Sequence, residues 1–77
     1  MILYIIMNLV KLGNNIRAER SRLRYSQEKL AAMAGILQPH LGKIERGEID
    51  IRISTFIAIM KALNVPFEKL YDVNDEK

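Results

Sequence analysis

The segment from residue 27 to residue 46, QEKLAAMAGILQPHLGKIER, most constrains what this chain can fold into. Its apolar residues recur at three- and four-residue spacings, which place side chains on one face of a helix. They are Leu30, Ala31, Ala34, Leu41 and Ile44. Gly35 stands between the two sets, where a residue without a Cβ takes a positive φ at little cost. The segment therefore predicts two short helices that meet at a sharp corner.

Two helices joined at a steep angle by a glycine turn are typical of the helix-turn-helix, whose second helix enters the major groove of DNA. The chain has 77 residues and a formal net charge of +3, which fits an anionic partner without proving one. Five cations and one anion lie between residues 11 and 24, whereas residues 68 to 77 are acidic overall. A cationic run is also typical of a solvated helix face, so both interpretations stay open.

The composition excludes several chemistries. The chain has no cysteine, so it forms no disulfide and has no thiolate, which agrees with a reducing cytoplasm. His40 is the single histidine, and this argues against a metal site. One histidine and no evident pair of carboxylates leave little for acid–base or nucleophilic catalysis. We therefore expect a cytoplasmic protein that is not an enzyme and that uses no metal or other cofactor.

Residues 1–11 form an apolar N-terminal extension. It is shorter than the roughly 20 residues of a membrane-spanning helix, and it lacks the basic start and cleavage site of a signal peptide. Either it packs on its own domain, or it pairs with the same segment of a second subunit. Two-fold DNA sites usually bind two-fold dimers, which favours the second. The predicted dimer interface consists of Ile2, Leu3, Tyr4, Ile5, Ile6, Phe67 and Tyr71.

A first helix is predicted from about Leu9 or Leu12 to Leu23. Arg20 falls on its apolar stripe, and an unpaired buried charge is costly. Glu45 is the favoured carboxylate partner. The alternative is that Arg20 reaches water from the edge of the core.

The remaining elements follow from cap and turn residues. Ser26 is predicted to cap the second helix, and the third begins near Gln38. Residues 48–53 are expected to form an extended loop. Ser54 is predicted to cap a fourth helix, which ends at Asn64 before a short last helix.

The sequence resembles the phage Cro/repressor-type helix-turn-helix family, the XRE-like transcriptional regulators. The resemblance rests on LGNNIRAER, SQEKLAAMAG, LGKIERGE and STFIAIMKALNVPFEKLY, which together extend from Leu12 to Tyr71. It implies an all-α fold, a compact bundle of about five helices like the lambda-repressor DNA-binding domain. Residues 12–71 would form this domain, with the extension before it and a polar tail at residues 72–77.

The resemblance also assigns roles to individual residues. The exposed face of the third helix, expected to read bases, would carry Gln38, Pro39, His40 and Lys43. The resemblance places Gln27, Arg46 and Arg52 at DNA phosphates, and we also expect Arg17, Arg24 and Ser26 there. Arg20 and Glu45 match the family's structural ion pair. Two residues depart from the family pattern: Leu37 replaces a small polar N-cap, and Arg24 replaces a glycine.

We therefore expect a homodimeric, sequence-specific regulator of transcription that binds double-stranded DNA. Gln38 can bond adenine through two hydrogen bonds, and Lys43 can reach the major-groove acceptors of guanine. The small size suggests a phage-like repressor or a restriction-modification controller protein. The alternative is an antitoxin or adaptor module that acts mainly through a protein partner, such as a toxin or RNA polymerase.

Overall fold

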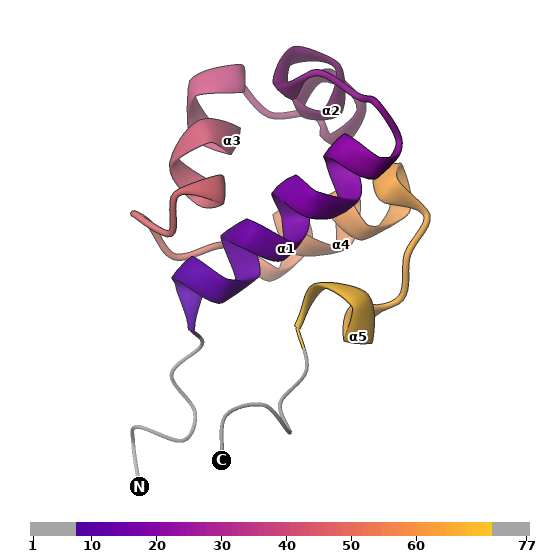
Figure 1. Ribbon diagram of the computed structural model, residues 1–77. Helices are drawn as coiled ribbons and strands as arrows, with labels where there is room; N and C mark the ends of the chain where they lie inside the picture. The colour runs from indigo at the N-terminus through magenta and orange to yellow at the C-terminus, as the bar shows by residue number, and fades with distance from the viewer. Residues whose placement is uncertain (1–7, 72–77) are drawn as a thin grey trace, which may run out of the picture.

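The structure, a computed structural model, describes residues 8–71, which form five helices and no strand (Figure 1). They are α1 (Leu9–Arg22), α2 (Gln27–Ala34), α3 (Gln38–Glu45), α4 (Ile53–Leu63) and α5 (Phe67–Leu70). The predicted all-α bundle is thereby confirmed. The predicted dimer-interface residues 2–6 and the tail at residues 72–77 lie outside the described residues.

The core lies where the apolar faces of all five helices meet. In this bundle α1 packs against α3 and α5, while α2 packs against α3 and α4. The side chains exposed by no more than 4 % are Leu12, Ile16, Leu30, Ala31, Leu41, Ile44, Phe56, Ile59, Leu63, Leu70 and Tyr71. The apolar positions predicted on either side of the glycine corner are thus buried, except that Ala34 is half-buried.

The first four helices end in the same backbone arrangement, the Schellman motif. A residue with positive φ follows each helix: Arg24 (61°), Gly35 (73°), Gly47 (72°) and Asn64 (56°). At each end, the residue with positive φ and the next residue donate their N–H groups to carbonyls of the last turn. The predicted roles of Gly35 and Asn64 are confirmed. Arg24 adopts the same left-handed conformation although its Cβ makes that conformation costly.

The helix starts are less uniform. Asn8 and Ser26 cap α1 and α2, because their side chains accept hydrogen bonds from backbone N–H groups three residues later. The prediction that Ser54 caps α4 is wrong, because the N-cap is Arg52 and its side chain makes no capping bond. The preceding loop packs partly buried isoleucines against the core, and the helix begins directly after it.

Two contacts hold α1 firmly against the rest of the fold. A Cβ on Gly13 would overlap the backbone carbonyls of Ile44 and Glu45, so α1 and α3 approach backbone to backbone. At the N-cap of the same helix, the Tyr71 hydroxyl accepts a hydrogen bond from the Asn8 N–H (3.1 Å). Tyr71 is thus buried within the chain. Of the predicted dimer-interface residues that the structure describes, Phe67 and Tyr71, only Phe67, 38 % exposed, offers appreciable surface.

Candidate nucleic-acid interface

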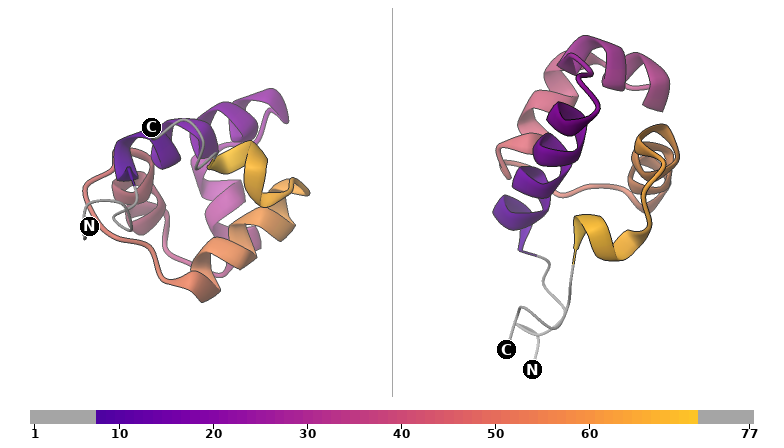
Figure 2. Two further views of the ribbon diagram at one scale, coloured as in Figure 1. Left: turned by 90° about the horizontal axis from the view of Figure 1, so that it is seen from below. Right: turned by 45° about the vertical axis from the view of Figure 1, so that its right-hand side comes forward.

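One side of α3 faces away from the core. Figures 1 and 2 show α2 and α3 meeting at a steep angle at the end of the molecule opposite α5. Leu41 and Ile44 point inward and are buried, whereas Pro39, Lys43 and Arg46 are exposed. Positions 39, 43 and 46 are three or four residues apart and therefore form one stripe on the exposed face of α3, which ends at its C-cap Arg46. This stripe, which we call the α3 stripe, is available to a ligand.

The inner side of α3 carries a buried carboxylate. The Glu45 side chain is completely buried and accepts hydrogen bonds from Arg20 through Nε (2.7 Å) and Nη2 (3.1 Å). Arg20 also donates from Nη1 to the carbonyl of Tyr25 (2.9 Å), and Arg17 Nε lies 3.7 Å from the Glu45 carboxylate. Arg20 therefore pairs with Glu45, the partner favoured by the sequence, and its side chain is only 16 % exposed.

A chain of side-chain hydrogen bonds leads from this ion pair to the start of α3. Gln27 Nε2 donates to the Glu45 carboxylate (2.9 Å), and Gln38 Nε2 donates to Gln27 Oε1. The two residues expected at a phosphate and at a base are thus joined to each other and anchored in the core. A Cβ on Gly42 would lie 3.3 Å from Arg46 Nη1 and 3.6 Å from Gln27 Oε1, so this glycine separates their polar ends.

The end of the α3 stripe carries an exposed ion pair. Arg46 donates to Glu48 from Nε (2.7 Å) and Nη2 (3.3 Å), and both side chains are about half exposed. The hydrogen bond from Arg46 lowers the pKa of Glu48, and the nearby charge of Lys43 acts in the same direction. The pKa of Arg46 is raised by the same contact. Lys43, Arg46 and Glu48 therefore form one electrostatic group.

The other predicted site residues lie on separate segments. Arg17 lies on α1, Arg24 in the turn before α2, and Arg52 directly before α4, and all three are exposed. His40 on α3 is half-buried. The Ser26 hydroxyl is engaged as a helix cap by the backbone N–H of Lys29 (2.9 Å).

Sequence reasoning missed two surface residues near this site. Leu37, considered above only as a departure from the family's N-cap, is 77 % exposed directly before α3 and makes no capping hydrogen bond through its side chain. Glu48 was overlooked because one acid in a loop is unremarkable; the available signal was its place two residues after Arg46, at the end of the helix.

A helix-turn-helix family model matches residues 16–70. The control protein C.SmaI from Serratia marcescens is 39 % identical over 59 residues, which are 77 % of this chain and 70 % of that protein. The crystal structure of the restriction-modification controller protein C.AhdI from Aeromonas hydrophila has a TM-score of 0.79 at 30 % identity, covering 82 % of this chain and 96 % of that one. The clp gene regulator ClgR from C. glutamicum has a TM-score of 0.81 at 18 % identity, covering 91 % of each chain, and this shows a shared fold.

The fold and the α3 stripe thus define a helix-turn-helix protein. The chain belongs to the XRE-type helix-turn-helix family of transcriptional regulators.

Proposed function

We propose that this regulator binds double-stranded DNA sequence-specifically as a homodimer, with α3 in the major groove. The observation that carries the proposal is the hydrogen-bonded path from buried Glu45 through Gln27 to Gln38. It holds the N-terminal end of the candidate recognition helix in a fixed position, and side chains that are already fixed lose less entropy when they bind DNA. Lys43 lies farther along the same helix, and its exposed side chain can reach a DNA base.

Base readout and phosphate contact have different donors in this proposal. Gln38 and Lys43 supply most of the direct readout, with Pro39 and His40 beside them. Phosphate contacts come from Gln27 and the surrounding arginines, and these fix the register without reading sequence. The relatives C.SmaI and C.AhdI support a controller role in restriction-modification, which requires action in the cytoplasm where the DNA is.

A DNA selection experiment followed by affinity measurements tests this proposal. The double variant Gln38→Ala/Lys43→Ala should lose most of its preference for the selected duplex over random DNA, because each good bidentate base contact contributes about 1–3 kcal/mol of discrimination. Lys61→Ala, an exposed lysine on α4, is the control for loss of one charge. An unchanged preference in the double variant would refute the assignment of base readout.

The dimer has two candidate surfaces. One is the apolar segment at residues 2–6, and the other consists of the exposed apolar side chains Ile53, Ile57 and Phe67 on α4 and α5. A concentration-dependent mass measurement on the full chain, on a chain without residues 1–7 and on Ile57→Asp separates them. The variant that loses dimerisation identifies the surface; a full chain that stays monomeric at all concentrations would refute the homodimer.

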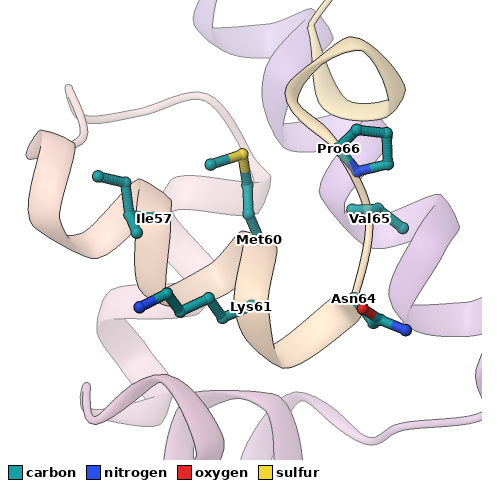
Figure 3. A pocket seen from close by; sticks show the side chains of 6 residues that line it. All are labelled: Ile57, Met60, Lys61, Asn64, Val65 and Pro66. Atoms are coloured by element: carbon teal, nitrogen blue, oxygen red, sulfur yellow. The ribbon is translucent and has the colours of Figure 1, made fainter.

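A second function, binding of a protein partner such as a toxin or RNA polymerase, has one observation in its favour. A groove of about 430 Å³ lies beside α4 (Figure 3). Its lining residues are Ile57, Met60, Lys61, Asn64, Val65 and Pro66. Tight binding of a protein partner together with weak DNA binding that has no sequence preference would favour this function over the first.

Among residues 8–71, no helix is long and apolar enough to cross a membrane.

A further inference from the structure

Glu48 is held in place by the backbone at the end of α3. Its N–H donates to the carbonyl of Lys43 (3.0 Å), and the N–H of Gly47 donates to the carbonyl of Ile44 (3.0 Å). Gly47 has the positive φ that closes this Schellman motif. A Cβ on Gly47 would also lie only 2.7 Å from the Cα of Val10, so the loop is packed against α1. The Glu48 backbone is therefore fixed relative to α3.

The Glu48 side chain occupies one edge of the Arg46 guanidinium that can donate two parallel hydrogen bonds. Its two oxygens accept from Nε and Nη2 of Arg46. A guanidinium binds carboxylates and phosphates with the same two-pronged geometry. The remaining nitrogen, Nη1, is turned toward Gly42 on α3. Arg46 cannot form a two-pronged contact with a DNA phosphate through Nε and Nη2 while Glu48 holds them.

We propose that Glu48 competes with DNA phosphate for Arg46 and thereby limits the affinity of α3 for DNA. This inference rests on the proposed DNA-binding function. An exposed ion pair contributes little, so the competition adjusts binding rather than blocking it. Binding to non-specific DNA comes almost entirely from phosphate contacts. A phosphate contact reads no sequence, so Glu48 weakens specific and non-specific binding by a similar factor.

Replacement of Glu48 by glutamine tests the competition, with Glu19→Gln as the matched control. Glu19 pairs with Arg22 on α1 at 2.8 Å, against 2.7 Å for the pair at Glu48, and both replacements remove one negative charge. The probes are a labelled duplex of arbitrary sequence and the duplex recovered by selection. E48Q should bind the arbitrary duplex about two- to fivefold more tightly per subunit. The slope of log affinity against log salt should steepen by up to about 0.9 per subunit. E19Q should change both quantities less.

A double-mutant cycle separates competition at Arg46 from a general change of charge. In the Arg46→Gln background, Glu48→Gln should give clearly less gain than in the wild type, because no guanidinium is left to release. An equal gain in both backgrounds, or an E48Q variant that behaves like E19Q, would overturn the proposal while leaving DNA binding intact. A wild-type chain that binds neither duplex would overturn the proposed function, and this inference with it.

Discussion

Removal of Arg20 should strongly destabilise the fold. The Arg20→Ala variant leaves the Glu45 carboxylate completely buried without its main partner, and Gln27 remains as a single donor. Breaking a buried ion pair from one side costs about 3–5 kcal/mol. We expect the lower end, about 3 kcal/mol, because Arg17 Nε lies 3.7 Å away and supplies part of the missing charge. A small domain has only about 0.05–0.15 kcal/mol of stability per residue, so this loss is a large fraction of the total.

Urea unfolding followed by far-ultraviolet circular dichroism measures this cost. The matched control is Arg22→Ala, which breaks the pair with Glu19, a pair of similar length on the same helix whose arginine is 59 % exposed. That loss should be no more than about 1 kcal/mol. If the two variants lost the same free energy of unfolding, the burial argument would be refuted.

An apolar replacement of both partners separates stability from function. Arg20→Met/Glu45→Leu removes the buried charge together with the group that neutralises it, so most of the lost stability should return. Gln27 then lacks the acceptor that holds its Nε2, and Gln38 loses its anchored partner. We therefore expect this double variant to fold well but to bind DNA more weakly than the wild type. Recovery of affinity together with stability would show that the ion pair does not position the recognition helix.

Two further predictions concern single residues. Arg24→Gly should stabilise the fold by about 1 kcal/mol, because it relieves the left-handed strain at a φ of 61°, and the Tm should rise by roughly 4–8 °C in thermal unfolding; a lower Tm would contradict this. Nuclear magnetic resonance titration should find the pKa of Glu48 below its usual range, and Arg46→Gln should return it toward normal. Because the folded-state pKa is lowered, the contribution of this pair to stability is present above the unfolded-state pKa and is lost as the pH falls through the folded-state pKa. A Glu48 pKa within the usual range of an exposed carboxyl group would show that the pair does not persist in solution.

Local patterns along the chain were sufficient to predict the helices and most of their ends. The spacing of Leu30, Ala31, Leu41 and Ile44 identified the buried faces, and Gly35 identified the corner. These features depend on neighbours three or four residues away, so the sequence displays them directly. The start of α4 was predicted wrongly at Ser54. There, packing of the preceding loop determined where the helix begins, and a good capping residue was not used.

The sequence by itself determined the class of fold, the glycine corner and the need of Arg20 for a carboxylate, because these follow from helical periodicity, backbone conformation and the cost of a buried charge. Only the tertiary structure decided that Gln27, 18 residues before Glu45, donates to the same carboxylate as Arg20. It also decided that Gln38 donates to Gln27. It also turned Leu37 outward and placed the Glu48 carboxylate on Arg46. Such contacts depend on the angles at which helices cross and on the path of short loops, and these are decided when the whole core packs.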